Sequence, residues 1–237
     1  MKMEFSAADV TCTLLGDPEA EYRVLQPVNS READGPEAEF ELLRTMLPEQ
    51  RFCLVAVETE NWFDVLSPWP SPAVIGGKSF AGSGAETLRR LETELLPALR
   101  QQYGGGGSTV LAGYSLAGLF ALWAGYETDC FSGIAAASPS VWYPGWPDYA
   151  AGRIPRTGAV YLSLGEREEK TRNPVMSGVG AAVRAQERLL RAQNVPCVLE
   201  WNPGNHFQEP TKRMAKGIAW VLTELGKHGP VGEETLF

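Results

Sequence analysis

The sequence predicts an α/β fold in which a mostly parallel sheet is covered by helices on both faces. Short apolar runs rich in β-branched residues alternate with long amphipathic stretches along most of the 237 residues, which is the pattern of successive βαβ units. No internal repeat, low-complexity linker or shift in composition divides the chain. We therefore expect a single domain over residues 1–237, a size at which one core is sufficient for folding.

Seven short apolar runs predict the strands of this sheet. In chain order they are Val10–Leu15, Tyr22–Pro27, Phe52–Val57, Thr109–Ala112, Gly133–Ala137, Val160–Leu164 and Val198–Trp201. The first two are separated by the turn signal Gly16-Asp17-Pro18, so they predict an antiparallel hairpin at the N-terminal edge of the sheet.

Five stretches predict helices. They are Glu37–Met46, Ala85–Tyr103, Leu116–Gly125, Val179–Asn194 and Pro210–Lys227. The second is preceded by a capping region at Ser83 and Gly84 and ended by the glycine run Gly104–Gly107. This run lacks the lysine that a phosphate-binding loop places before its serine, which argues against a nucleoside triphosphate site.

Composition and charge exclude several classes of protein. The 21 basic and 29 acidic residues leave a formal net charge of -8, and because the basic residues are scattered we expect no nucleic-acid partner. No stretch approaches the ~18 apolar residues of a membrane span and the N-terminus has no apolar leader, so we expect a cytoplasmic protein that does not contact membranes. Cys12, Cys53, Cys130 and Cys197 lack the spacing of zinc or redox sites, so we expect reduced cysteines, no metal and no cofactor.

The chemistry of the chain is concentrated where the strand Thr109–Ala112 runs into Gly113-Tyr114-Ser115-Leu116-Ala117-Gly118 and an apolar helix follows at once. This context is typical of a nucleophile elbow, a tight strand-to-helix turn that exposes a strained serine hydroxyl between small neighbours. The usual pattern is G-x-S-x-G, and here Ala117 takes the place of the last glycine. Ser115 is the predicted nucleophile.

A serine nucleophile needs a base, and the chain contains two histidines. His228 lies in the polar tail after the last predicted helix, where a solvent-exposed residue is expected. His206 lies in the turn between the last predicted strand and the last predicted helix, the place at which this kind of fold presents its base. We therefore predict that His206 is the general base and that activity falls as the pH drops through the ordinary range of histidine, ~6.5.

The acid that orients the histidine is expected after the strand Val160–Leu164, which leads into Gly165-Glu166-Arg167-Glu168-Glu169. Glu168 lies three residues after the glycine, a spacing common for this acid, and is the predicted third member. Glu166 is the nearer competitor because it points the same way by alternation, whereas Glu169 points the opposite way. The chain order serine, acid, histidine is that of α/β-hydrolases and differs from those of chymotrypsin and subtilisin.

The oxyanion hole of such a site consists of two backbone N–H groups. One should belong to Leu116, directly after the nucleophile and at the positive end of its helix. The other should come from the loop after Phe52–Val57, where Glu60, Asn61 and Trp62 are candidates. We predict Asn61.

Two long irregular stretches, Glu58–Gly84 and Ser138–Gly158, are rich in aromatic residues and should border the site, because long loops in compact domains are usually functional. We predict that Trp62, Trp142 and Tyr114 contact the substrate in a pocket with aromatic walls. The alternative is that several of the aromatic side chains anchor the long loops to the body of the protein.

Four segments together resemble the Putative esterase family of α/β-hydrolases, which includes esterase D and the siderophore esterases. They are the elbow Gly113–Gly118, Ser138–Trp142, the turn Gly165–Glu169 and the turn Gly204–Phe207, within a similarity that spans roughly residues 52–221. The resemblance implies the α/β-hydrolase fold, hydrolysis of small-molecule carboxylic esters or thioesters, no metal or organic cofactor, and Ser115 and His206 as nucleophile and base.

Two features of this family bear on details. Some siderophore-esterase relatives work with a Ser-His dyad, so the resemblance leaves the acid open. The chain also lacks the additional N-terminal region of the cytoplasmic enterobactin esterases, from which we expect a substrate other than a catecholate trilactone.

Three other functions fit part of the pattern. Gly113-x-Ser115-x-x-Gly118 is a degenerate dinucleotide fingerprint, but Ser115 replaces the glycine that lets the pyrophosphate approach, and the motif comes late in the chain. An acyltransferase would pass the same acyl-enzyme to an alcohol or amine, which competition between water and added nucleophiles would reveal. A catalytically inactive binding protein of this fold would have no reason to retain Ser115 and His206 in this context.

Overall fold

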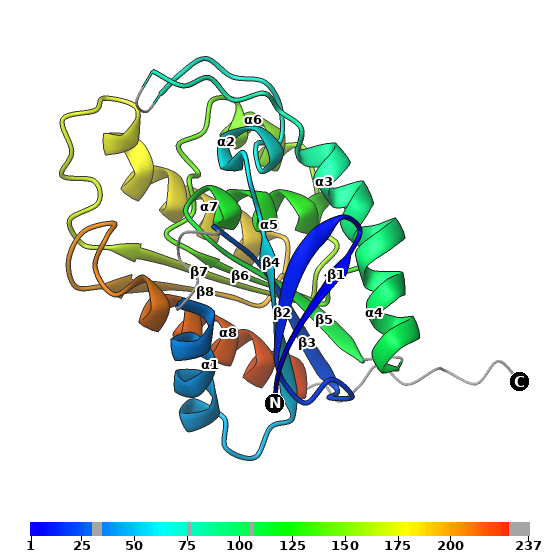
Figure 1. Ribbon diagram of the computed structural model, residues 1–237. Coiled ribbons are helices and arrows are strands. Elements are labelled where there is room, and N and C mark those ends of the chain that lie inside the picture. Colours follow the sequence, from blue (N-terminus) through cyan, green and yellow to red (C-terminus); the bar gives the residue numbers. More distant parts are fainter. Residues whose placement is uncertain (30–34, 75–76, 105–106, 228–237) are drawn as a thin grey trace, which may run out of the picture.

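The computed structural model describes residues 1–29, 35–74, 77–104 and 107–227, which contain one eight-stranded sheet (Figure 1). Its strands are β1 (Lys2–Ala7), β2 (Val10–Gly16), β3 (Tyr22–Val28), β4 (Phe52–Glu58), β5 (Ser108–Tyr114), β6 (Gly133–Ala137), β7 (Ala159–Gly165) and β8 (Cys197–Asn202). They lie in the order β1-β2-β4-β3-β5-β6-β7-β8, and all neighbours from β4 to β8 pair in parallel. The predicted mostly parallel sheet is confirmed.

The N-terminal edge of the sheet is built differently from the prediction. β2 pairs antiparallel with β4, which lies between β2 and β3, so the predicted hairpin of β2 with β3 is wrong. The antiparallel hairpin at this edge is formed by β1 and β2, with Ala7 opposite Val10. β1 gives no apolar run in the sequence because it is an edge strand in which exposed and half-buried residues alternate.

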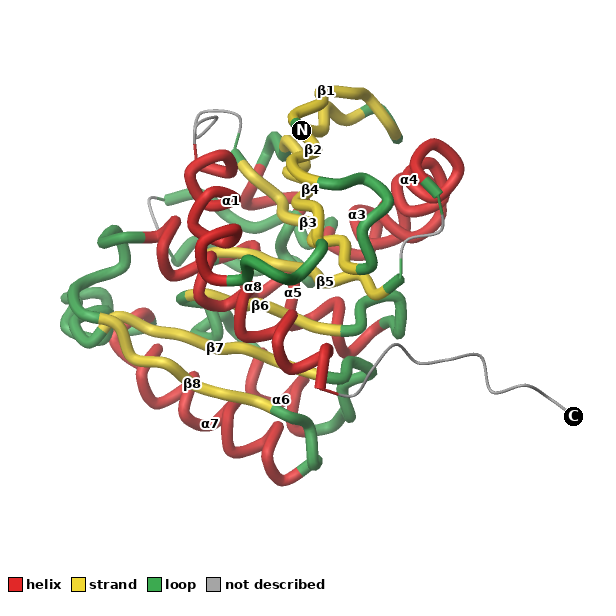
Figure 2. The backbone as a smooth tube through the Cα atoms, turned by 90° about the horizontal axis from the view of Figure 1, so that it is seen from below, coloured by secondary structure: helices red, strands yellow, loops and turns green. Residues whose placement is uncertain are grey.

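Helices cover both faces of the sheet (Figure 2). On one face α1 (Gly35–Met46) and α8 (Pro210–Lys227) lie side by side. The other face is covered by α3 (Gly84–Arg90), α4 (Leu96–Tyr103), α5 (Leu116–Glu127) and α7 (Val179–Ala192). Because successive strand residues point to opposite faces, Val24 packs in the cluster under α1 and α8 while Leu25 packs in the cluster under α5.

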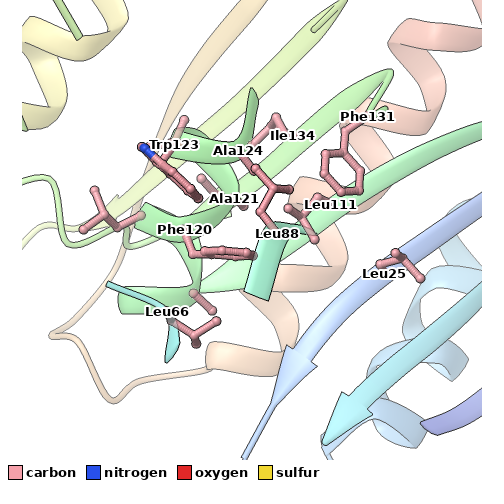
Figure 3. Packing of buried hydrophobic residues seen from close by; sticks show 14 of the residues in the cluster. Leu25, Leu66, Leu88, Leu111, Phe120, Ala121, Trp123, Ala124, Phe131 and Ile134 are labelled. Atoms are coloured by element: carbon pink, nitrogen blue, oxygen red, sulfur yellow. The ribbon is translucent and has the colours of Figure 1, made fainter. Parts of the chain in front are cut away.

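The helix that follows the elbow is the most deeply buried part of the fold. Every residue of α5 except Glu127 is buried, as expected for a helix that is apolar all round. Figure 3 shows Phe120 and Trp123 of this helix packed among side chains of the strands and of neighbouring helices. The segment that begins directly after Ser115 is therefore firmly held.

The predicted helix Ala85–Tyr103 is one continuous helical segment with a change of pitch. α3 passes into α4 through a π-helical turn at Leu91–Leu95. Gly105 and Gly106, in the middle of the predicted turn after α4, lie outside the described residues. The irregular stretches contain two helices that were not predicted, α2 (Trp62–Val65) and α6 (Trp146–Ala151), because helices this short carry no periodic pattern.

Two further properties concern the described part of the chain. None of its helices is both long and apolar enough to cross a membrane. All four cysteines are free; Cys12 and Cys53 are buried, and Cys130 and Cys197 are half-buried.

The parallel strands decide where functional side chains meet. Ser115 follows the last residue of β5, Glu168 comes three residues after β7, and His206 comes four residues after β8. The carboxyl ends of parallel strands meet at one edge of the sheet. Glu168 and Ser115 therefore contact the His206 side chain although they lie 38 and 91 residues away in sequence.

Candidate active site

Ser115 occupies a strained turn between β5 and α5. Its φ of 59° and ψ of -118° lie in a region that residues with a side chain rarely adopt, a strain typical of functional sites. The turn is so tight that a Cβ on Gly113 would come within 2.3 Å of the Ala117 backbone, so position 113 requires glycine. Ala117 itself is fully buried, and its methyl group is part of the hydrophobic core.

The structure brings Ser115, His206 and Glu168 together. His206 Nε2 lies 3.0 Å from Ser115 Oγ, and His206 Nδ1 lies 2.7 Å from Glu168 Oε2. The imidazole is 26% exposed and the carboxylate 5%, so one end of this line is open to a ligand and the other is enclosed. His228 lies outside the described residues.

Several donors surround the Glu168 carboxylate. Ser138 Oγ and the backbone N–H of Gly165 each donate to Oε1 over 2.7 Å, and Arg213 Nη1 donates to the same oxygen over 2.9 Å. Burial acts to raise the pKa of Glu168, but the hydrogen bonds with His206, Ser138 and Gly165 and the attraction to a positively charged His206 outweigh it, so the pKa lies below its ordinary value. The carboxylate is therefore charged.

The two competing glutamates lie elsewhere. Glu166 is exposed. Glu169 forms a 3.4 Å ion pair with Arg184 on α7. Glu168 is thus the glutamate that the turn after β7 presents to His206. Gly165 provides room for this turn, because a Cβ there would lie 2.6 Å from the carbonyl oxygen of Gly204 and 3.0 Å from Glu168 Oε1.

Arg213, on the first turns of α8, is a site residue that the sequence analysis missed. It is 1% exposed and donates to Glu168, to the hydroxyls of Tyr114 and Ser138, and to the carbonyl oxygens of Pro203 and Asn205. Tyr114 in turn donates its hydroxyl to the carbonyl oxygen of His206 over 2.7 Å. Arg213 therefore ties the acid and the histidine loop into one network. The available signal was a basic residue next to Met214 on the buried face of α8.

The predicted oxyanion donors, Leu116 and Asn61, lie in different surroundings. Leu116 begins α5, so its N–H has no acceptor four residues earlier within that helix. Asn61 has a left-handed conformation with φ of 50°, and its carbonyl accepts from the N–H groups of Asp64 and Val65. It belongs to the wall of a separate cavity of about 420 Å³, whereas its neighbour Trp62 belongs to the wall around Ser115. The wall around Ser115 therefore includes Trp62 and not Asn61, the residue that we predicted as the second donor.

Ser115 and His206 open into a cavity of about 670 Å³. Its wall is formed by the end of β3, the first turns of α1 and α8, Trp62, and the residues flanking the serine and the histidine: Gln26, Pro27, Val28, Asn29, Gly35, Pro36, Glu39, Trp62, Tyr114, Phe207, Pro210, Thr211 and Met214. Phe207, directly after the histidine, is 86% exposed. The cavity is thus partly apolar and large enough for a small-molecule ligand.

Of the three predicted substrate contacts, Trp62 and Tyr114 belong to this wall and Trp142 does not. Trp142 instead packs against the core, with its ring 6.5 Å from that of Tyr143. Tyr143 is fully buried and donates its hydroxyl to the carbonyl oxygen of Trp69. The aromatic residues of Ser138–Gly158 therefore anchor the long loops against each other, which was the alternative left open by the sequence.

No group of three or more His, Cys, Asp or Glu side chains in the described ranges has an arrangement that could hold a metal ion. The polar groups that meet at Ser115 are instead a hydroxyl, an imidazole and a carboxylate. This combination can generate an alkoxide nucleophile without a metal.

Comparison with known proteins identifies the family. The family model described as "Putative esterase" matches residues 60–207, more than half of the chain. The chain belongs to this esterase family. It is therefore a carboxylic ester hydrolase.

Individual relatives of this esterase are distant in sequence. It is 25% identical over 198 residues to the "Uncharacterized protein YbbA" of Bacillus subtilis (strain 168), covering 77% of this chain and 79% of that protein. An IroE-like serine hydrolase from Shewanella oneidensis matches with a TM-score of 0.75 and 17% identity, covering 93% of this chain and 79% of that chain. The siderophore hydrolase EstA from Aspergillus nidulans matches with a TM-score of 0.69 and 18% identity, covering 95% and 94%. These likenesses show the α/β-hydrolase fold.

Proposed function

We propose that this esterase hydrolyses carboxylic esters through an acyl-enzyme on Ser115, with His206 as general base and Glu168 as the orienting acid. The observation that carries the proposal is the unbroken line of contacts from Ser115 Oγ through both ring nitrogens of His206 to Glu168, 3.0 and 2.7 Å long. A serine hydroxyl is a weak nucleophile near neutral pH, and an imidazole at this distance can take its proton as it attacks.

In the first half of the reaction, Ser115 Oγ forms a bond to the carbonyl carbon of the ester while its proton passes to His206 Nε2. The carbonyl oxygen takes the electron pair of the double bond and becomes an oxyanion. When this intermediate collapses, the bond to the alcohol breaks and Nε2 gives the proton to the departing oxygen. Glu168 accepts the Nδ1–H throughout, which holds the tautomer in which Nε2 is free to accept.

In the second half, a water molecule takes the place of the alcohol. His206 removes one of its protons as the water oxygen attacks the acyl carbon, and the proton returns to Ser115 Oγ when the carboxylic acid leaves. The hydrogen bonds of Arg213 hold the histidine loop and Glu168 in their relative positions during both halves of the reaction. Arg213 acts through these groups and is a positioning residue.

For the oxyanion we infer two backbone donors, the N–H groups of Leu116 and Trp62. Each residue begins a helix, so its N–H lacks an intrahelical acceptor, and Leu116 also lies at the positive end of α5. Fixed donors aimed at the developing charge are usually the largest single contribution to such catalysis. Because Trp62 belongs to the wall of the cavity around Ser115 and Asn61 does not, we infer Trp62 in this role.

The proposal is tested with p-nitrophenyl acetate and a fluorophosphonate probe. We expect a single covalent label on the wild-type protein and none on Ser115→Ala, because only an activated serine reacts with the probe. Ser115→Ala should lose nearly all turnover, keeping at most the ~10³–10⁴-fold acceleration over water that oxyanion donors and binding supply.

His228→Ala is the matched control for His206→Ala and should remain active. Retention of more than about a tenth of the wild-type rate by Ser115→Ala, well above what a site without its nucleophile retains, would place the nucleophile elsewhere. An active His206→Ala protein beside an inactive His228→Ala protein would exclude His206 as the base.

A further inference from the structure

A buried glutamate interrupts the apolar face of α1. The buried residues of this helix are Pro36, Glu39, Phe40 and Leu43, which follow the i, i+3, i+4, i+7 spacing of a single face. Packing alone would favour an aliphatic side chain at Glu39, which is only 2% exposed. A buried acid within an otherwise apolar helix face destabilises the fold, and such positions are often found at functional sites.

The carboxyl group of Glu39 is poorly provided with hydrogen bonds. Gln26 Nε2 donates to Glu39 Oε2 over 3.2 Å. Within the described part of the chain, Glu39 Oε1 and Gln26 Oε1 are both buried and have no hydrogen-bond partner. Gln26 is itself 8% exposed. Buried polar atoms are nearly always paired in folded proteins, so these two neighbouring oxygens lack a donor whenever Glu39 is ionised.

The Gln26–Glu39 pair belongs to the wall of the cavity into which Ser115 and His206 open. The first turn of α8, which lies beside α1 (Figure 2), completes this part of the wall with Pro210, Thr211 and Met214. No lysine or arginine of the described ranges belongs to the wall. A substrate whose ester group lies at Ser115 therefore occupies a cavity whose described wall includes two residues with unpaired acceptor oxygens and no lysine or arginine.

The charge of Glu39 depends on what occupies that space. Burial raises the pKa of its carboxyl to about 8, and the hydrogen bond from Gln26 only partly opposes this shift. A buried carboxylate is favourable only when a positive charge or several donors accompany it. A cationic ligand would supply both.

We propose that Gln26 and Glu39 form a recognition site for a primary ammonium group, so that the preferred esters carry a cationic amine in their acyl or alcohol part. This inference rests on the proposed function of Ser115 and names its substrate class. An ammonium group has three N–H donors and a full positive charge. It can donate to both unpartnered oxygens and neutralise the carboxylate, whereas an anionic group would be repelled by that carboxylate and a hydroxyl has a single donor to give. The net charge of -8 of the chain also attracts cations.

The wild-type protein alone provides the first test. We would compare, at neutral pH, the p-nitrophenyl esters of ω-aminohexanoic, ω-hydroxyhexanoic and heptanoic acid, which have the same length and end in ammonium, hydroxyl and methyl. We expect kcat/KM for the ammonium ester to exceed that for the methyl ester by about 10- to 100-fold, the size expected of hydrogen bonds to charged groups. Equal values, or a preference for the methyl or hydroxyl ester, would overturn the proposal.

Variants then assign the preference to the pair. Glu39→Gln preserves the shape and removes the charge, so the ratio of kcat/KM for the ammonium ester to that for the methyl ester should fall to near one. Gln26→Met removes one acceptor and should lower the ratio less. Glu41→Gln, on the exposed face of the same helix, is the matched control and should keep the wild-type ratio.

An unchanged ratio in Glu39→Gln would exclude the site, and circular dichroism verifies that each variant is folded. If Glu39→Gln does not fold, the ratio in Gln26→Met decides. Failure of the inference and failure of the proposed function are distinguishable. If the protein hydrolyses p-nitrophenyl acetate and all three esters without preferring the ammonium ester, only the recognition site is refuted. If the protein hydrolyses none of these esters and Ser115 does not react with the fluorophosphonate probe, the proposed function is refuted.

Discussion

Two buried glutamates near the reactive serine differ in their surroundings, and the difference shows what decides the charge of a buried acid. Glu168 lies at the corner of β7 and α8, where a hydroxyl, a backbone N–H, a guanidinium and an imidazole all reach its carboxylate. Glu39 lies at the corner of α1 and β3, where Gln26 supplies the hydrogen bond. The side chain of Glu168 is 5% exposed, and Glu39 as a whole residue is 2% exposed.

The pKa values of the two carboxyl groups move in opposite directions. Burial acts to raise both, but the donors around Glu168 hold its pKa below the ordinary value, while that of Glu39 rises to about 8. The pKa of each carboxyl group therefore reflects the balance between burial and the donors within reach, and this balance differs between the two sites. Near neutral pH Glu168 is charged and suited to orienting His206, and Glu39 is neutral until a donor reaches it.

The largest effect is expected from removing the charge of Glu168. Glu168→Gln should reduce kcat by up to ~10⁴, because His206 then samples the wrong tautomer. The variant should still fold, with lower stability, since Arg213 loses its counter-charge. Turnover of p-nitrophenyl acetate and circular dichroism measure the two effects.

Glu166→Gln and Glu169→Gln are the matched controls and should be close to wild type, since their side chains lie away from His206. Normal turnover in all three variants would make the site a Ser-His dyad. Loss of turnover in Glu166→Gln or Glu169→Gln alone would leave the triad in place and refute the assignment of its acid.

The second largest effect is expected from removing Arg213, whose guanidinium group pairs with Glu168 and has no counterpart at Glu39 among the described residues. Arg213→Met should lower the free energy of unfolding by about 3–5 kcal/mol, because it leaves a buried carboxylate without its ion partner and frees two loop carbonyls. Urea denaturation measures this change. Arg184→Met is the control: its ion pair with Glu169 is exposed, so the loss should stay below about 1 kcal/mol. Equal losses in the two variants would show that burial of the pair has no consequence.

The pH dependence of stability should separate the two glutamates. The folded-state pKa of Glu39 lies above the unfolded value of 4.5, so the folded state binds more protons between about 4.5 and 8 and stability falls as pH rises through that window, by at most about 1.4 kcal/mol per pH unit. Glu168 has the opposite sign: its contribution is present above 4.5 and is lost as pH falls below that value.

Glu39→Gln should remove the decline between pH 4.5 and 8 and leave the acid limb unchanged. Urea denaturation at a series of pH values compares the variant with the wild type. Parallel curves for the two proteins across that window would mean that Glu39 is charged in the folded protein, contrary to its raised pKa.

The smallest effect is expected at the edge of the Glu168 network. Tyr114→Phe removes the hydroxyl that donates to the His206 carbonyl and accepts from Arg213. The loss in the free energy of unfolding should be about 1 kcal/mol, the usual net value of such a hydrogen bond, and thermal unfolding can detect it. A loss as large as that of Arg213→Met would show that the tyrosine stabilises the histidine loop as strongly as the arginine does.

Local patterns were sufficient for the features that depend on neighbours in sequence. The elbow around Ser115 follows from small residues between an apolar strand and an apolar helix, since a Cβ at position 113 would lie only 2.3 Å from the Ala117 backbone. The spacing after Gly165 selected Glu168 over its two neighbours, and the structure places this glutamate against His206. The boundaries predicted for α8, Pro210–Lys227, agree with the structure because that helix has a clear apolar face.

The order of the strands and the surroundings of individual side chains depend on residues far apart in the chain, and local sequence patterns did not predict them. The insertion of β4 between β2 and β3 is a matter of sheet order, which the separate strand patterns do not contain. Trp142 and Trp62 look alike as tryptophans in irregular stretches, and both pack against the core, yet only Trp62 also belongs to the wall of the cavity around Ser115.

The sequence by itself determined the α/β class, the nucleophile and base to be expected, and the acid to be favoured among three glutamates, because each is encoded by residues within one strand, turn or helix. The tertiary structure alone decided that Arg213 joins the acid to the histidine loop and that Gln26 and Glu39, from β3 and α1, share a cavity with Ser115. These side chains lie far apart in the chain and carry no common motif. Burial and the donors within reach set their charge, and both exist only once the helices have packed on the sheet.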